Sequence, residues 1–251
     1  MTAVLGPPGS LDPSLVLGAY AVGVFPMADA RDAADVYWVE PRERAILPLD
    51  GFRLSTSLRK TLAADRYRVT ADIAFDRVIA LCAEPADDRP DTWINAGIAA
   101  VFTRLHATGF AHSVEVWDGD RLAGGLYGLA LGRAFFGESM VSRARDASKV
   151  ALAWLVARLR TGGFELLDCQ FMTPHLASLG AVEITRAAYL SKLASALSDG
   201  AGAGSADGAA RAGDFGALDR LGAGSAAGAA TVADSGPLSG KLIAQLLIQT
   251  S

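Results

Sequence analysis

Cysteine is scarce in this chain, and long apolar runs are absent. Its two cysteines, Cys82 and Cys169, lie far apart inside apolar segments, which argues against a disulfide framework and fits a reducing compartment. Gly, Arg or Asp interrupts every apolar run well before the roughly 20 residues that a membrane-spanning helix needs. The N-terminal residues also lack the basic and apolar regions of a secretory signal. We therefore expect no membrane association and a cytoplasmic location.

Histidine is also rare, and its placement suggests no metal site. His106, His112 and His175 fall on three separate predicted elements, and no Cys/His spacing is typical of zinc. No histidine belongs to a recognisable catalytic triad. Cys169 is a poor candidate for an acyl-carrying nucleophile. It follows Asp168 directly in a predicted strand, so its side chain points to the face opposite that of Asp168. We expect neither a metal nor a cofactor.

The formal net charge of -4 argues against a strongly basic nucleic-acid-binding protein. Residues 40–68 depart from this average, with seven basic against four acidic side chains. Such a local basic face can bind phosphates on a protein of low net charge. An ordinary solvated surface is the alternative. The basic residues in this stretch are Arg42, Arg44, Arg53, Arg59, Lys60, Arg66 and Arg68.

Apolar periodicity divides the chain into a core and two terminal parts. Residues 1–9 form a short lead, residues 10–70 a small N-terminal domain, and residues 71–197 the main domain. Residues 198–237 are rich in Gly, Ala and Ser; with few large apolar side chains, we expect a flexible insert. Residues 238–251 regain apolar character, and we expect them to dock onto the core as a short strand or helix.

The main domain is predicted to be α/β (α+β), with a mostly antiparallel sheet flanked by helices. Alternating or apolar runs at 112–118, 122–131 and 133–142, separated by turn signals, predict an antiparallel meander. A helix to residue 160, a buried strand at 165–171 and a final helix to residue 197 follow. This order resembles the GNAT acyltransferase fold. The connection at 142–149 lacks the glycine-rich turn expected of a coenzyme A user, which disfavours that donor.

Two carboxylates fall on strands that are predicted to be buried. Glu138 lies in FFGESM and Asp168 in ELLDCQF. A buried carboxylate must be paired, hydrogen-bonded or protonated. Convergence of the two would create a site for a cation, a proton or an amine. Structural salt bridges to Arg143 or Arg145 are the alternative.

Ten sequence blocks in order resemble the leucyl/phenylalanyl-tRNA–protein transferase family, over about residues 10 to 197. Tyr37 stands where many members have a second tryptophan, and the 198–237 insert has no counterpart that we identify. The blocks are GAYAVGVFPM (18–27), YWVEPRERAILPLD (37–50), SLRK (57–60), TWIN (92–95), HSVEVW (112–117), GGLYG (124–128), FFGESMVSR (135–143), DASKVAL (146–152), LLDCQF (166–171) and HLASLGAVEI (175–184).

The resemblance implies transfer of Leu or Phe, and more weakly Met, from aminoacyl-tRNA to the α-amine of proteins that begin with Arg or Lys. The enzyme would be a monomer that uses no cofactor. Asp168 would orient the ammonium and help to move its proton. Gln170, on the same strand face, would hydrogen-bond near the ester carbonyl. Glu138 would hold the basic acceptor residue or support Asp168.

The resemblance also implies an aminoacyl pocket and a tRNA surface. Three of the pocket residues recur at helical spacing, and plain core packing is the alternative for them. The predicted pocket residues are Leu126, Phe135, Met140, Leu152, Leu155 and Leu159. The residues predicted to contact the terminal adenosine are Trp38 and Trp93, and those predicted to contact phosphates are Arg42, Arg44, Arg59 and Lys60.

Two other functions remain open from the sequence. One is a GNAT-type acyltransferase that uses another activated donor. The other is a tRNA- or peptide-binding module without catalytic activity.

Overall fold

A seven-stranded sheet runs through the computed structural model, which describes residues 11–85, 91–198, 212–224 and 238–248. All neighbouring strands are antiparallel except β7 and β8, which are parallel and are joined by helix α5 (Ala147–Thr161). The predicted fold class is confirmed. In sheet order the strands are β4 (Arg68–Ala71), β5 (Ala111–Asp118), β6 (Arg121–Leu131), β7 (Ala134–Ser142), β8 (Leu166–Gln170), β3 (Glu43–Ile46) and β9 (Val182–Thr185).

The three long strands β5, β6 and β7 form the predicted meander. Gly119 and Gly132 occupy the two tight turns with φ of 61° and 57°, a left-handed conformation that glycine adopts without steric strain. Most of β6 is buried, which agrees with its nearly continuous apolar sequence.

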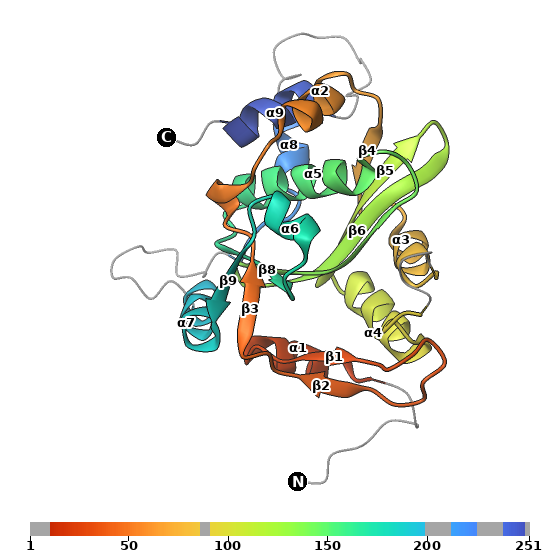
Figure 1. Ribbon diagram of the computed structural model, residues 1–251, viewed down its shortest axis with the longest axis vertical. Helices are drawn as coiled ribbons and strands as arrows, with labels where there is room; N and C mark the ends of the chain where they lie inside the picture. Colours follow the sequence, from red (N-terminus) through yellow and green to blue (C-terminus); the bar gives the residue numbers. More distant parts are fainter. Residues whose placement is uncertain (1–10, 86–90, 199–211, 225–237, 249–251) are drawn as a thin grey trace.

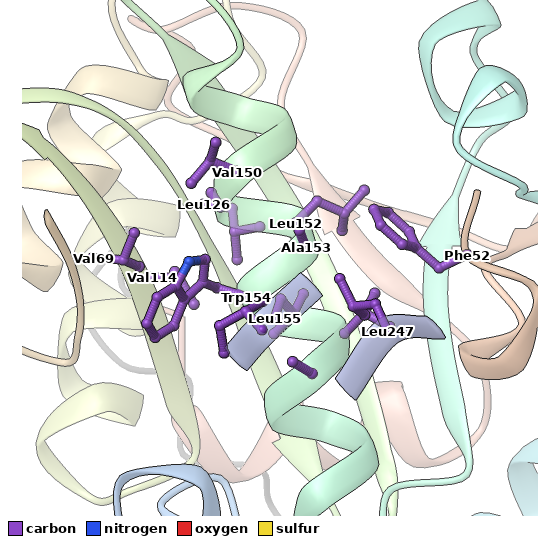
Figure 2. Close-up of a cluster of buried hydrophobic side chains, with 14 of the residues drawn as sticks. Phe52, Val69, Val114, Leu126, Val150, Leu152, Ala153, Trp154, Leu155 and Leu247 are labelled. Carbon is purple, nitrogen blue, oxygen red and sulfur yellow. The ribbon is translucent and has the colours of Figure 1, made fainter. Parts of the chain in front are cut away.

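Helix α5 is buried along almost its whole length. It begins after Asp146, which contacts Lys149 at 3.3 Å and does not cap the helix with its side chain. It ends at Thr161, one residue beyond the predicted end at residue 160, and Gly162 follows as its C-cap. Figure 2 shows the apolar side chains that surround α5, including Leu126 from β6 and Leu247 from the C-terminal helix.

The remaining helices lie in two groups, one for each large apolar cluster. The cluster around α5 includes α2 (Thr56–Ala63) and α9 (Gly240–Ile248). The other cluster contains α1 (Pro13–Ala21), α3 (Phe75–Cys82), α4 (Ala96–Ala107) and α7 (Arg186–Leu197). Two short helices, η1 (Leu49–Gly51) and α6 (Pro174–Ser178), lie in connections. Among the described residues, no helix combines the length and apolar character required to cross a bilayer.

The N-terminal part contributes to the large sheet. Its own two-stranded sheet pairs β1 (Phe25–Met27) with β2 (Tyr37–Val39). Strand β3 lies between β8 and β9, and β4 forms the opposite edge of the seven-stranded sheet. The large sheet therefore begins earlier in the chain than the predicted boundary after residue 70.

The prediction of a flexible insert over 198–237 is wrong for residues 212–224. This segment contains helix α8 (Ala217–Gly224), and the Phe215 and Leu218 side chains are buried. Phe215 stacks on Phe135 with ring centroids 5.7 Å apart, and Arg158 forms two hydrogen bonds to Asp219 at 2.6 and 2.7 Å. These contacts pack the segment against α5. Residues 199–211 and 225–237 lie outside the described residues.

The C-terminal segment packs against the core as helix α9. Ile243, Ala244 and Leu247 are buried between α2 and α5. Arg160 of α5 donates a hydrogen bond to the Leu246 carbonyl at 3.0 Å, which satisfies a carbonyl near the C-terminal end of α9.

Candidate active site

A cavity of about 290 Å³ lies where β7 and β8 separate. These strands pair only from Ala134 to Phe136 and from Leu166 to Asp168. Beyond that point β7 stays paired with β6, whereas Gln170 pairs with Ala45 of β3. Residues of both diverging segments, including Glu138 and Gln170, line the cavity. The parallel pairing thus ends where the site begins.

The cavity wall is largely apolar. Four of the predicted pocket residues line it, and two do not. Phe135 and Leu159 are fully buried and belong to the apolar cluster around α5. Phe135 stacks against Phe215 there. The predicted residues that line the cavity are Leu126, Met140, Leu152 and Leu155.

Asp168 is fully buried and does not line the cavity. Its Oδ1 accepts hydrogen bonds from Arg44 Nε and the Gln170 backbone N–H, both at 2.9 Å. Its Oδ2 accepts from Arg44 Nη2 at 2.6 Å and from the Tyr189 hydroxyl at 2.8 Å. Both carboxylate oxygens are therefore occupied by protein donors. The carboxylate is therefore held by the protein and does not reach the cavity.

Gln170 turns into the cavity because its backbone is not extended. Its φ of 55° lies in the left-handed region, which is unfavourable for a residue with a Cβ atom. The side chain reaches β7, where Nε2 donates a hydrogen bond to Glu138 Oε1 at 3.2 Å. The prediction that Asp168 and Gln170 share one strand face is wrong, since the alternation rule applies only to extended backbone.

Glu138 is the carboxylate that faces the cavity. It is half-buried, and the surface that it exposes lies in the cavity wall. Burial raises the pKa of Glu138 to about 8, and the nearby Asp168 charge adds to the rise. The adjacent Tyr20 hydroxyl and the Arg44 charge both favour the anionic form of Glu138. The Tyr20 hydroxyl has no standard hydrogen-bond partner among the described residues.

Glu138→Gln is expected to stabilise the fold at alkaline pH. The pKa of Glu138 is higher in the folded than in the unfolded chain. The stability that protonation of Glu138 contributes is therefore fully present below about pH 4.5, and it is lost as the pH rises through about 8. The free energy of unfolding of the variant, measured relative to that of wild type, should rise by on the order of 2 kcal/mol from pH 5 to pH 9. Urea unfolding at both pH values measures this, with Glu183→Gln as an exposed control. Equal pH dependence in wild type and Glu138→Gln would contradict it.

The alternative of salt bridges from the two carboxylates to Arg143 or Arg145 is wrong, because both arginines pair elsewhere. Arg143 pairs with Glu84 at 2.6 Å, and Arg145 lies 3.7 Å from Asp146. The partner of Asp168 is Arg44, which is 1% exposed. Arg44 therefore lacks the exposed position that a phosphate contact requires, and its predicted phosphate role is corrected. Its place directly before the buried apolar residues Ala45, Ile46 and Leu47 is the sequence signal that could have indicated burial. No comparable signal identified Tyr189.

The remaining residues predicted to bind tRNA do not form one group. Trp93 lines the cavity, and Trp38 on β2 is 37% exposed. Arg42, Arg59 and Lys60 are exposed. Figure 1 shows α2, which carries Arg59 and Lys60, near one end of the long axis of the molecule and β2 near the other. The structure thus separates two parts of the predicted tRNA surface.

His175 and Cys169 also line the cavity. Burial lowers the pKa of His175, and its Nε2 has no hydrogen-bond partner within the described part of the chain. Burial raises the pKa of the Cys169 thiol, which therefore remains protonated and a poor nucleophile. No group of three or more His, Cys, Asp or Glu residues in the described ranges has the arrangement of a metal site.

Comparison with known proteins places the chain in a family. The profile of the leucyl/phenylalanyl-tRNA protein transferases matches residues 46–194, and that of their N-terminal domain matches residues 9–42. The leucyl/phenylalanyl-tRNA–protein transferase of Rhizorhabdus wittichii is 59% identical over 96% of this chain and 99% of its own. That of Zymomonas mobilis is 62% identical over 75% of this chain and 70% of its own.

Among solved structures, the chain is similar to the C-terminal domain (DUF2156) of a putative lysylphosphatidylglycerol synthetase from Agrobacterium fabrum. The TM-score is 0.37 with 13% identity, over 67% of this chain and 55% of the other. Both family profiles and the near full-length relative agree with the ten sequence blocks. The chain belongs to the leucyl/phenylalanyl-tRNA–protein transferase family.

Proposed function

We propose that this aminoacyltransferase moves Leu or Phe, and more weakly Met, from aminoacyl-tRNA to the α-amine of a protein that begins with Arg or Lys. The product carries a new peptide bond and is marked for degradation by the N-end rule pathway. The observation that carries the proposal is the apolar cavity with the Gln170–Glu138 pair in its wall. One part of this cavity suits an apolar side chain, and the other suits an amine.

The apolar wall accounts for the choice of donor amino acid. Leu126, Met140, Leu152 and Leu155 offer a Leu or Phe side chain contact without a polar partner. A charged side chain would lose its hydration there without compensation. One methylene group more or less in an apolar pocket changes the binding free energy by only about 1–3 kcal/mol. Such a pocket therefore accepts Leu, Phe and Met and discriminates poorly among them.

The polar pair accounts for the chemistry. The acceptor nitrogen forms a bond to the ester carbonyl carbon, the bond from that carbon to the ribose oxygen breaks, the ammonium loses a proton, and the ribose oxygen gains one. The ester is already activated, so no other energy source is required. An α-amine has an ordinary pKa of about 8, close to that of the cavity-facing Glu138. Similar pKa values suit proton exchange between the two groups.

These positions revise the expected division of roles. Glu138 lines the cavity, so we assign the contact with the incoming ammonium to Glu138 and not to Asp168. An ammonium beside Glu138 favours its anionic form. Gln170, which already donates to Glu138, lies next to the position proposed for the ester. Asp168 acts through Gln170, because its carboxylate accepts a hydrogen bond from the Gln170 backbone N–H.

The terminal nucleotide of the tRNA is proposed to bind at the mouth of the cavity, and other parts of the tRNA to contact basic residues farther away. Trp93 in the cavity wall and the partly exposed Trp38 are assigned to the terminal adenosine, since stacking on an indole contributes about 1–3 kcal/mol per base. Exposed Arg42, Arg59 and Lys60 are assigned to phosphates. We propose that the enzyme works as a monomer in the cytoplasm.

The test is transfer of labelled Phe from Phe-tRNA to a peptide that begins with Arg. We expect labelled peptide with Arg-initiated and Lys-initiated acceptors. We expect none with an N-acetylated Arg peptide, which lacks the nucleophilic amine, or when acetyl-CoA replaces the tRNA. A folded enzyme that binds Phe-tRNA and transfers nothing to the Arg-initiated peptide would contradict the proposal.

A further inference from the structure

We propose that Arg44 and Tyr189 are positioning residues for aminoacyl transfer. Through Asp168 they hold Gln170 in the left-handed conformation that directs its amide to Glu138. The inference rests on the proposed function and deepens it, because it assigns roles to two side chains that lie outside the cavity. Three buried polar side chains converge behind the cavity wall: Arg44, Asp168 and Tyr189 are 1%, 0% and 2% exposed.

The first step concerns the backbone of Gln170. The left-handed region is unfavourable for glutamine and persists where surrounding contacts enforce it. Asp168 Oδ1 accepts the Gln170 backbone N–H at 2.9 Å across two residues, an arrangement by which Asp side chains stabilise turns. An extended Gln170 would share the face of Asp168, away from the cavity. The Asp168 carboxylate therefore determines where the glutamine amide points.

The second step concerns the carboxylate. Arg44 Nε and Nη2 contact both of its oxygens, and the Tyr189 hydroxyl donates to Oδ2 at 2.8 Å. A two-pronged guanidinium contact fixes the plane of a carboxylate, and an ammonium does not. Tyr189 adds a donor from α7, a different element. Together they prevent rotation of Asp168 away from the Gln170 N–H.

The third step concerns what holds Arg44. Its Nη1 donates to the Gly23 carbonyl at 3.0 Å, and its guanidinium lies between the rings of Phe25 and Tyr189, at 4.6 and 4.5 Å from their centroids. A Cβ atom on Gly23 would lie 3.0 Å from Tyr189 Cε1. The N-terminal part therefore packs directly against the network that sets Gln170.

A buried ion pair is seldom the most stabilising way to fill a core, because apolar residues of similar volume often serve as well or better. Here the pair has a geometric consequence that apolar side chains could not reproduce. It supplies the acceptor for one backbone N–H in the cavity wall. This is the property that the experiment isolates.

The experiment is a double-mutant cycle between Tyr189→Phe and Gln170→Ala. Tyr189→Phe keeps the ring over Arg44 and removes only the hydroxyl. We expect its kcat for Phe transfer to fall about tenfold, as loss of a hydrogen bond to a charged group implies, with KM for Phe-tRNA within about twofold of wild type. In the Gln170→Ala background, Tyr189→Phe should cause no further loss. Arg44→Lys, which keeps the charge, should behave like Tyr189→Phe.

Two further measurements separate positioning from simple stability. Tyr67→Phe is the matched control, since its hydroxyl also makes one hydrogen bond, to the Arg145 carbonyl at 2.7 Å; it should keep the wild-type kcat. Hydrogen exchange at the Gln170 backbone amide needs no activity, and Tyr189→Phe should accelerate it at least about tenfold while amides of β6 keep their rates. Unchanged exchange at Gln170, or losses that multiply in the double variant, would overturn the inference. Failure of wild type to transfer Phe would instead refute the proposed function, and the exchange result would stand independently.

Discussion

Asp168→Ala is expected to lower the free energy of unfolding by about 3–5 kcal/mol and to remove most of the transfer activity. The substitution leaves the Arg44 guanidinium buried without its counter-charge, which is strongly destabilising. It also removes the acceptor of the Gln170 N–H. Because Asp168 does not line the cavity, the affinity for aminoacyl-tRNA should change little. Urea unfolding and steady-state kinetics at a permissive temperature measure the two effects separately.

A second variant distinguishes the two effects. Arg44→Met combined with Asp168→Ala removes both charges, so it should regain much of the lost stability and remain inactive. Recovery of activity along with stability would mean that Asp168 matters only for folding, which would contradict its role behind Gln170.

Deletion of residues 212–224 is expected to lower the free energy of unfolding by at least about 4 kcal/mol. The deletion removes the buried Phe215 and Leu218 side chains and leaves a void against Phe135. It also leaves the buried Arg158 without the Asp219 carboxylate and the Phe215 carbonyl, which accept its hydrogen bonds. The shift in the urea midpoint measures the loss.

Single substitutions make the deletion interpretable. Phe215→Ala alone should lower the free energy of unfolding by about 3–5 kcal/mol. Arg220→Ala should lower it by less than about 0.5 kcal/mol, because Arg220 is exposed in its ion pair with Asp214. A deletion variant as stable as wild type would show that the packing of Phe215 contributes nothing.

Local sequence signals predicted the meander and the helix that follows it. Gly119 and Gly132 mark the turns, Gly162 marks the end of α5, and the apolar runs between them are long enough to define strands and helix. They also placed Glu138 on a strand, which the structure contains as β7. These features depend on residues that are neighbours in the chain, so pattern reasoning reaches them.

Other features of the site depend on contacts that a pattern does not contain. The direction of Gln170 follows from one left-handed residue, which overrides the alternation of a strand. The pairing of Arg44 with Asp168 arises because β3 lies beside β8, a neighbour relation between distant segments. The ordering of residues 212–224 was missed for another reason. An average composition rich in Gly, Ala and Ser concealed the two buried side chains Phe215 and Leu218.

The position of β3 in the sheet has a consequence for biosynthesis. This strand lies between β8 and β9, which emerge from the ribosome only after most of the chain has been translated. Pairing between such distant segments is intrinsically slow, and unpaired strand edges in the meantime favour aggregation. A nascent chain therefore carries β3 without its partners while the residues between Ile46 and Leu166 are translated. Chaperone dependence during translation should accordingly be governed by this early strand.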